Sequence, residues 1–368
     1  MVSFPTQALG NATDKRFKDI KTMLEKKKVA LLHGAGYAGG ELIRLLANHP
    51  YLTLQVVTSR TFAGQPVWAA HPALRGQVDL VFEEVLDGSL ASLDAVFVAA
   101  EHGQGVRAVR ALLAQGFEGA VVDLSADFRF KDPALYESWF GFTHPDPALL
   151  DRFIYGLPEV FAPYPPQSRY LANPGCFATG LTLALYPPAR HLPTGHASVT
   201  ALTGASGSGT RPSSTTHFPT RDGNVRAYKV LAHQHLPEVR QTLGPTLEVT
   251  FVPASGPWVR GIWGTAMVVL PEGVSAETVG NWYAEAYATS PAVRLWPGRL
   301  PELRYAVGTP FCDLGWIVEG RQLVVGFALD NLLKGAASQA VQNLNLLLAL
   351  PEMAGLLPLD AVSEAVVS

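Results

Sequence analysis

Two short stretches of the sequence carry side chains that can do covalent and acid–base chemistry. In the first, Cys176 follows Asn173, Pro174 and Gly175 and precedes ten residues with few helix breakers, a pattern that predicts a helix beginning at the cysteine. Because the N–H groups and dipole of a helix N-terminus favour an anion, this position should lower the pKa of the thiol and make it a nucleophile. The alternative interpretation is a small hydrophobic side chain buried at a helix start.

The second stretch holds two histidines, His233 and His235, which are followed by Pro237 and Glu238. The proline and the acid predict a helix that begins just after the histidines. A histidine beside a thiolate is a standard acid–base partner, whereas two surface or capping histidines are the alternative. No nearby cysteine or acid cluster completes a ligand set, so we expect no metal. The sequence leaves open which of the two histidines acts.

A glycine-rich turn lies far upstream of both stretches. Gly34, Gly36 and Gly39 form a G-x-G-x-x-G pattern between a predicted strand at 29–32 and a predicted helix, which is the setting that binds a dinucleotide pyrophosphate. About 20 residues further on, where an acid would bind a ribose 2′-OH, the chain has Ser59 and Arg60. A guanidinium and a hydroxyl suit a 2′-phosphate, so the sequence predicts NADP(H) over NAD.

The surrounding pattern indicates which elements position these groups. Predicted strands at 95–100 and 120–124 flank a predicted helix at 105–113, and this alternation indicates a doubly wound parallel sheet. Arg260, between two later predicted strands, is a candidate clamp for a carboxylate or phosphate. An apolar helix after residue 330 should return to pack on the first domain. Further strands are predicted at 197–203, 247–253, 261–270 and 323–329, with a helix at 276–288.

The bulk composition excludes several classes of protein. The 368 residues carry 28 Lys and Arg against 31 Asp and Glu, so the chain has no basic excess for nucleic acid. The only cysteines, Cys176 and Cys312, cannot form a disulfide framework, which predicts a reducing, cytoplasmic location and a structural role for Cys312. Residues 1–27 lack the apolar core of a signal peptide, and no apolar run is long enough to span a membrane. We therefore expect neither export nor a membrane partner.

Seven motifs, taken together and in order from about residue 28 to 350, resemble those of the N-acetyl-γ-glutamyl-phosphate reductase family in the semialdehyde dehydrogenase group. Each motif alone is common, but their joint occurrence in this order is specific. That family reduces an acyl phosphate to an aldehyde with NADPH in arginine biosynthesis. The motifs lie at 34–42, 58–60, 123–129, 155–159, 173–176, 233–238 and 330–337.

The resemblance implies an α/β fold, with a Rossmann NADP-binding domain and an α+β catalytic domain of the glyceraldehyde-3-phosphate dehydrogenase type. The implied boundaries are an N-terminal extension at 1–27, a Rossmann domain at 28–173 completed by a C-terminal helix at 331–350, and a catalytic and dimerisation domain at 174–330. It also implies a small acyl phosphate as substrate and assembly into a homodimer or homotetramer.

The resemblance further implies roles for individual side chains. Cys176 would be the nucleophile that forms a thioester, His235 the acid–base group, and Glu238 a catalytic residue close to them. The expected cofactor-binding residues are Gly34, Gly36, Tyr37, Ala38, Gly39, Ser59, Arg60, Ser206, Gly207 and Asn331. The expected substrate-binding residues are Arg129, Arg260 and Asn173.

Two alternatives remain beside this interpretation. The same chemistry could act on carrier-bound aminoadipyl phosphate, in lysine biosynthesis, or on aspartyl phosphate. A non-catalytic NADP-binding regulator would instead keep the fold and lose the chemistry, but the joint presence of Cys176, His235 and Glu238 argues against it. The loop at 206–209, followed by Pro212, favours the arginine-pathway family over the lysine-pathway relatives.

Overall fold

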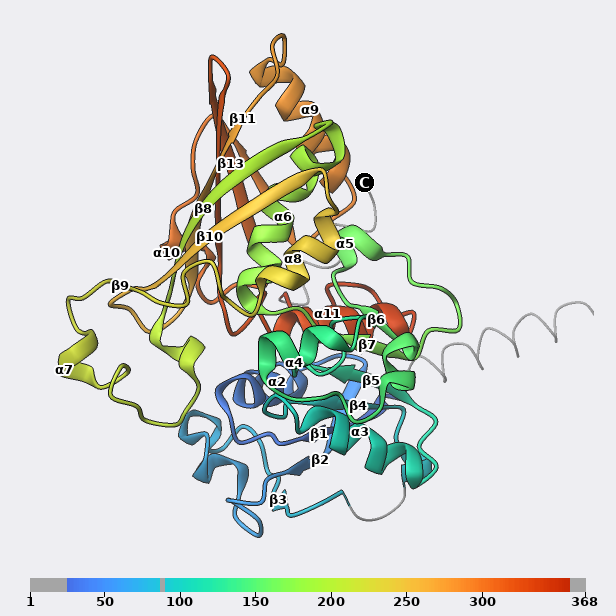
Figure 1. The fold of residues 1–368 in the computed structure, drawn as a ribbon. Helices are drawn as coiled ribbons and strands as arrows, with labels where there is room; N and C mark the ends of the chain where they lie inside the picture. The colour runs from blue at the N-terminus through green and yellow to red at the C-terminus, as the bar shows by residue number, and fades with distance from the viewer. Residues whose placement is uncertain (1–24, 87–89, 358–368) are drawn as a thin grey trace, which may run out of the picture.

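The computed structural model describes residues 25–86 and 90–357 of the chain. These residues form two seven-stranded sheets, one below the other in Figure 1. The expected N-terminal extension, 1–27, lies largely outside the described residues, and Lys27 already begins the first strand. None of the described helices is both long and apolar enough to cross a membrane, and no group of metal-ligating side chains was found in these ranges.

The first sheet is parallel throughout, with the order β3-β2-β1-β4-β5-β7-β6. Because the chain starts at the centre and moves first to one edge and then to the other, a crevice opens at the carboxyl ends of β1 and β4, where ligands bind in such folds. The doubly wound parallel sheet predicted from the sequence is therefore confirmed. The strands are β1 (Lys27–Leu32), β2 (Leu52–Thr58), β3 (Phe82–Glu83), β4 (Ala95–Val98), β5 (Ala120–Asp123), β6 (Phe153–Tyr155) and β7 (Tyr170–Ala172).

Helices cover both faces of this sheet. On one face, α2 (Tyr37–Ala47) and α11 (Ala337–Leu347) pack their apolar side chains into a single buried cluster with the strands. On the other face, α3 (Gly105–Ala114) and α4 (Ala134–Phe140) contribute to a second cluster. The last helix of the chain thus returns to the first sheet, as its apolar pattern predicts. Segments about 300 residues apart in the sequence therefore share one core.

The C-terminal helix is shorter than the expected 331–350. The segment before Ala337 forms turns instead, because the Asp330 carboxylate accepts hydrogen bonds from the backbone N–H groups of Leu332 and Leu333. The Gly335 N–H also bonds back to the Asp330 carbonyl oxygen. Residues 331–336 are consequently held as a compact loop, and this loop reaches the site described below.

The second sheet is mixed, with the order β12-β13-β14-β11-β8-β10-β9. One of its faces is covered by α6 (Cys176–His191), α8 (Leu236–Leu243) and α9 (Ala276–Tyr287), which enclose the largest buried cluster. Cys312 is buried at the start of β13, in line with its structural interpretation. The strands are β8 (Gly195–Thr203), β9 (Arg226–Ala227), β10 (Leu247–Ser255), β11 (Ile262–Val269), β12 (Val293–Pro297), β13 (Cys312–Glu319) and β14 (Gln322–Leu329).

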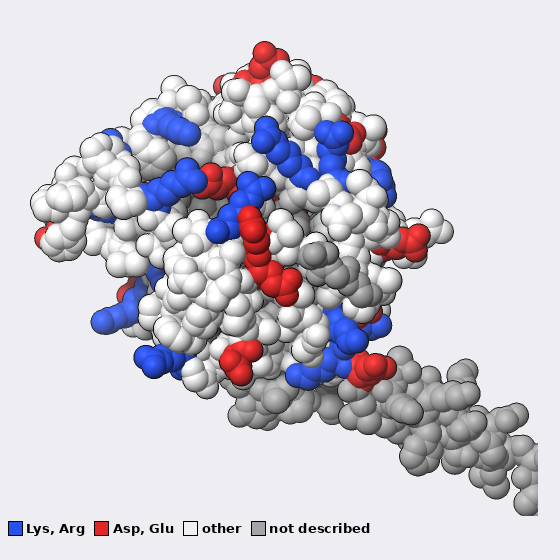
Figure 2. Space-filling model, turned by 90° about the horizontal axis from the view of Figure 1, so that it is seen from below, with Lys and Arg blue, Asp and Glu red and all other residues white. Residues whose placement is uncertain are grey.

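The short helices α5 (Pro158–Phe161), α7 (Phe218–Arg221) and α10 (Leu303–Ala306) lie in the connections. Of these, α7 belongs to a long excursion between β8 and β9 that projects to one side of the molecule (Figure 1). On the face shown in Figure 2, basic and acidic side chains are interspersed, and no large patch of a single sign is visible.

Candidate active site

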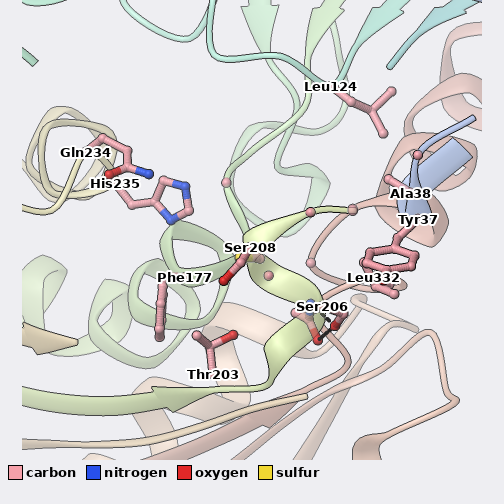
Figure 3. Close-up of a pocket in the computed structure, with 18 of the residues that line it drawn as sticks. Tyr37, Ala38, Leu124, Phe177, Thr203, Ser206, Ser208, Gln234, His235 and Leu332 are labelled. Atoms are coloured by element: carbon pink, nitrogen blue, oxygen red, sulfur yellow. Dashed lines mark hydrogen bonds between the residues drawn. The ribbon is translucent and has the colours of Figure 1, made fainter. Parts of the chain in front are cut away.

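A cavity of about 490 Å³ lies where the two sheets meet. It is lined by the glycine-rich turn at 36–39, by the start of α6 at Cys176, by the 206–209 loop and by both histidines of the second stretch. Figure 3 shows Tyr37, Ser206 and His235 around this space on three separate segments. The stretches picked out in the sequence are therefore brought together, although more than 190 residues separate the first from the last.

Cys176 is the first residue of α6, as predicted, and Gly175 is the N-cap. Its side chain is partly exposed to the cavity, and Gly335 packs directly against it, since a Cβ on that glycine would collide with the cysteine Cβ. The predicted lowering of the thiol pKa is wrong. Burial raises the pKa of Cys176 to about 11, which outweighs the lowering effects of the helix N–H groups and of Arg129. A thiol with a raised pKa needs a base before it can act as a nucleophile.

His235 lies next to the start of the cysteine helix. It is the N-cap of α8, as the proline and acid predicted, and its ring packs against Gly175, immediately before the nucleophile. Burial, together with the charge of Arg129, holds the pKa of His235 well below its usual range. The imidazole is therefore neutral, and its buried Nδ1 has no hydrogen-bond partner. A neutral, unpartnered imidazole can accept a proton.

His233 lies beside His235 but is tied into the protein. Its ring is packed among Phe177, Tyr228 and Phe251, and its Nδ1 accepts a hydrogen bond from the backbone N–H of His235 at 3.2 Å. Burial lowers the pKa of His233 to about 2. His233 is thus held by aromatic packing and by the His235 backbone, whereas the Nδ1 of His235 has no partner among the described residues.

Glu238 lies beneath the cavity rather than on its wall. It is fully buried, and its Oε2 accepts hydrogen bonds from the Gly175 N–H at 2.9 Å and from the Tyr155 hydroxyl at 2.8 Å. Its Oε1 forms an ion pair with Arg129 at 3.0 Å. Because both carboxylate oxygens are engaged and neither reaches the cavity, Glu238 positions the Cys176 helix. A catalytic role for Glu238 stays a prediction, and these contacts favour a positioning role.

Arg129 and Asn173, expected to bind substrate, line the cavity, but their polar groups are largely engaged. Besides its ion pair with Glu238, Arg129 donates from Nε to the Asn173 carbonyl oxygen and from Nη2 to the Leu124 carbonyl oxygen. The Asn173 amide donates to the Ala336 carbonyl oxygen and accepts from Asn343. Both side chains hold the floor of the site together. Each of the three guanidinium nitrogens of Arg129 donates to a protein acceptor, while the side chain lines the cavity.

Arg260 does not reach this cavity. Its guanidinium is paired with the carboxylates of Asp330 and Glu41, with Nη1 2.6 Å from Glu41 Oε1. The residue therefore ties the mixed sheet to α2 and to the loop that precedes α11. The guanidinium is paired with two carboxylates outside the main cavity, and its expected contact with substrate stays a prediction.

The glycine-rich turn fits a dinucleotide. Gly36, the N-cap of the eleven-residue helix α2, faces open space, because a Cβ placed on it would meet no atom within 4 Å. A Cβ on Gly39 would instead collide with the backbone of Gly34, so this glycine allows α2 to pack closely on the first strand. Tyr37 and Ala38 line the cavity beside the turn. Open backbone at a helix N-terminus is the arrangement that binds a pyrophosphate.

Ser59 and Arg60 line a second cavity, of about 280 Å³, at the carboxyl end of β2. His33, which immediately precedes the glycine-rich turn, also lines this cavity. The cavity therefore adjoins the turn. Arg107 of α3 faces the same cavity and was not expected from the sequence. The space is where the ribose end of a dinucleotide would lie.

The loop at 206–209 and the turn before α11 meet on the cavity wall. The Asn331 side chain exchanges hydrogen bonds with the Ser206 hydroxyl and accepts one from the Gly261 N–H at 2.7 Å. Gly207 lines the cavity beside them. These three expected cofactor residues therefore form one rigid corner.

Several cavity residues were missed by the sequence analysis. His102 lines the cavity, and burial lowers its pKa to about 4. Arg221, Arg226 and Tyr228 also line it. Nothing in their spacing marks them, because they lie on an irregular excursion whose path the local pattern does not determine. The only available signal was two arginines close to the histidine stretch.

Two models of protein families match this chain. The semialdehyde dehydrogenase NAD-binding domain matches residues 28–164, and the semialdehyde dehydrogenase dimerisation domain matches residues 176–331. The first range contains the glycine-rich turn, and the second begins at Cys176 and contains His235. The fold and the site together define a semialdehyde dehydrogenase.

Curated relatives show which family within this class the chain is similar to. An N-acetyl-gamma-glutamyl-phosphate reductase of Dehalococcoides mccartyi is 41% identical over 341 residues, which cover 90% of this chain and 98% of the relative. One from Methanosarcina acetivorans is 40% identical over 89% of this chain and 98% of the relative. The chain belongs to the N-acetyl-gamma-glutamyl-phosphate reductase family.

Solved structures show the same fold at low identity. An aspartate semialdehyde dehydrogenase of Vibrio cholerae has a TM-score of 0.67 at 17% identity, covering 88% of this chain and 99% of that chain. Another, from Candida albicans and solved with NADP, has a TM-score of 0.66 at 16% identity, with the same coverage. At this level of identity, these similarities show the fold alone.

Proposed function

We propose that this protein reduces N-acetyl-γ-glutamyl phosphate to N-acetylglutamate 5-semialdehyde with NADPH, through a thioester on Cys176, as a step of arginine biosynthesis. The observation that carries the proposal is the joint placement of Cys176, His235 and the glycine-rich turn on one cavity. The identity to reductases of this name, over nine-tenths of the chain, supports the same substrate.

In the first half-reaction, Cys176 Sγ attacks the acyl carbon of the substrate while neutral His235 takes the thiol proton. The bond from that carbon to the phosphate oxygen breaks, and inorganic phosphate leaves. A base is required because burial keeps the pKa of the thiol near 11. The Gly175 N–H, held by Glu238, fixes the first turn of the cysteine helix during the attack.

In the second half-reaction the thioester carbon is reduced, and NADPH held by the residues below would supply the hydride. The oxyanion that results collapses to the aldehyde, the carbon–sulfur bond breaks, and the Cys176 thiolate recovers the proton held on His235. The glycine-rich turn would hold the pyrophosphate, and the rigid corner of Ser206, Gly207 and Asn331 would support the nicotinamide end. The positive charge of Arg129, which lines the cavity, would face the phosphate.

The choice of NADPH over NADH rests on the cavity at the end of β2. Ser59 and Arg60 offer a hydroxyl and a guanidinium to a 2′-phosphate, and Arg107 adds a second positive charge on the same wall. Titration of the protein with both reduced cofactors tests this preference. We expect tighter binding of NADPH, and tighter binding of NADH would overturn the assignment.

The proposal includes a homodimer or homotetramer in the cytoplasm, with a Rossmann domain at 28–173 and a catalytic domain at 174–330. The match to a dimerisation domain supports self-association, and the two cysteines are unpaired. Met267, Val269 and Ile317 are exposed apolar side chains on the mixed sheet, and they suit an interface between copies. Sedimentation or light scattering gives the oligomeric state directly.

The reverse reaction tests the function in one assay. We expect phosphate-dependent reduction of NADP⁺ when N-acetylglutamate 5-semialdehyde is supplied. Activity found only with a carrier-linked aminoadipate semialdehyde, or only with aspartate semialdehyde, would replace the substrate assignment. Cofactor binding without turnover of any of the three aldehydes would favour the non-catalytic regulator.

A further inference from the structure

Two arginines that the proposed mechanism does not use lie on the wall of the main cavity. Arg221, at the end of α7, is only 9% exposed, and Arg226 lies on β9 nearby. The Arg221 guanidinium donates one hydrogen bond, from Nη2 to the Thr203 carbonyl oxygen at 3.1 Å. Its Nε is buried without any partner. A mostly buried guanidinium is thus left with unused donors beside the cavity.

No protein carboxylate compensates these two charges. Neither Arg221 nor Arg226 forms an ion pair within residues 25–86 and 90–357. No aspartate or glutamate among those residues lines the cavity, whereas Arg129 adds a third guanidinium to its wall. Burial lowers the pKa of Arg221, and the charge of Arg226 lowers it further. An anion that entered here would relieve both the desolvation and the repulsion.

Tyr228 locates this pair relative to the nucleophile. Burial raises the pKa of its phenol, the Cys176 thiol raises it further, and Arg221 and Arg226 oppose the rise. Tyr228 lines the main cavity together with Cys176 and both arginines, so the pair and the nucleophile share one space. Arg129, by contrast, acts directly on the pKa of the thiol.

We propose that Arg221 and Arg226 bind the α-carboxylate of the substrate, at the end remote from the acyl phosphate. This inference rests on the proposed function, which supplies a substrate with an anion at each end. A guanidinium matches a carboxylate with two parallel hydrogen bonds, and the unused donors of Arg221 provide for them. The phosphate end then falls to the cysteine side, beside Arg129. The pair makes the site selective for acyl chains that carry a carboxylate.

The test compares two aldehydes in the reverse reaction with phosphate and NADP⁺. N-acetylglutamate 5-semialdehyde carries the α-carboxylate, and 4-acetamidobutanal is the same chain without it. For the wild-type protein we expect kcat/KM to be about 10- to 100-fold higher with the carboxylate, the range for hydrogen bonds to a charged group. Arg221→Met and Arg226→Met should each remove most of this ratio by raising KM for the first aldehyde only. Arg221→Lys should restore part of it.

The matched control is Arg211→Met. Arg211 lies on the same excursion and is 83% exposed, and it pairs with Glu101 outside the cavity, so its removal changes the net charge equally. This variant should keep the wild-type ratio, and KM for phosphate should stay unchanged in all four variants. A rise in KM for phosphate in Arg221→Met or Arg226→Met, with the aldehyde ratio intact, would assign the pair to the phosphate and overturn the inference.

Two further outcomes separate this inference from the proposed function. If the wild-type protein turns over the first aldehyde but both arginine variants keep the full ratio, the inference fails and the function stands. If the wild-type protein does not turn it over, the function fails, and calorimetric binding of N-acetylglutamate against 4-acetamidobutanoate still tests the pair. Equal binding of these two acids by the wild-type protein would refute the carboxylate site. Arg226→Met keeps the test valid if Arg221→Met does not fold, because Arg226 is exposed.

Discussion

Replacing Glu238 with glutamine should destabilise the protein while leaving the cavity wall chemically unchanged. The carboxylate is fully buried and accepts hydrogen bonds from Gly175, Tyr155 and Arg129. In Glu238→Gln, Arg129 becomes a buried charge without a counter-ion, and one former acceptor becomes an NH₂ group. Removing one partner of a buried ion pair costs about 3–5 kcal/mol. We expect a loss of that size in the free energy of unfolding.

The same substitution should also reduce kcat, because the Gly175 N–H loses the acceptor that holds the first turn of the Cys176 helix. A displacement of about 1 Å at the nucleophile is enough for a loss of about 10²-fold. Urea unfolding gives the stability change, and the phosphate-dependent reduction of NADP⁺ gives kcat. Glu248→Gln is the matched control, because Glu248 is an exposed glutamate on β10.

The double variant Glu238→Gln with Arg129→Met separates the ion pair from the hydrogen bonds. Since the second change removes the uncompensated charge, part of the lost stability should return, while kcat should stay low. A Glu238→Gln protein as stable as the wild type to within about 1 kcal/mol, yet without activity, would refute this reasoning. It would restore Glu238 as a direct acid–base group.

Four further predictions follow from the site. Cys176→Ser should abolish turnover while NADPH binding, measured by fluorescence, survives. His235→Ala should lower kcat by about 10²–10⁴-fold, and a larger loss in His233→Ala would exchange the roles of the two histidines. Alkylation of Cys176 by iodoacetamide should rise about tenfold per pH unit from pH 7 to 10, because its pKa is raised to about 11, and a plateau near pH 7 would contradict this. Acid should destabilise the fold. His49 becomes protonated near pH 6.5 when unfolded but only near pH 4 when folded, so this residue alone should contribute a loss of about 1.4 kcal/mol per pH unit to the urea-unfolding free energy between these values.

The sequence was sufficient to predict those features of the fold and site that depend on a local pattern of residues. The glycines of the first turn, the proline before Glu238 and the residues around Cys176 each mark a helix N-terminus, and the structure has helices beginning there. The doubly wound sheet followed from strand–helix alternation. The three-residue strand β6 (Phe153–Tyr155) escaped notice because it is too short to show a period.

The sequence was insufficient to predict pKa values and side-chain partners, because these depend on which groups meet in the folded protein. The lowered pKa expected for Cys176 followed from the helix N-terminus alone, but burial of the thiol in the folded cavity outweighs that local effect. Arg260 has the residue type and position of a substrate clamp, yet Asp330 and Glu41, from distant segments, take its donors. Arg221 lies close to the histidine stretch in sequence, but its unpartnered Nε becomes evident only from its place in the fold.

The central claim is covalent catalysis by Cys176, and intact-protein mass spectrometry tests it most directly. Mixing the enzyme with N-acetyl-γ-glutamyl phosphate in the absence of NADPH should add one N-acetylglutamyl group, release one equivalent of phosphate and place the label on Cys176 after digestion. Addition of NADPH should then remove the label and yield the aldehyde. An unmodified protein that still turns over with NADPH, or a Cys176→Ser protein that does so, would contradict the account.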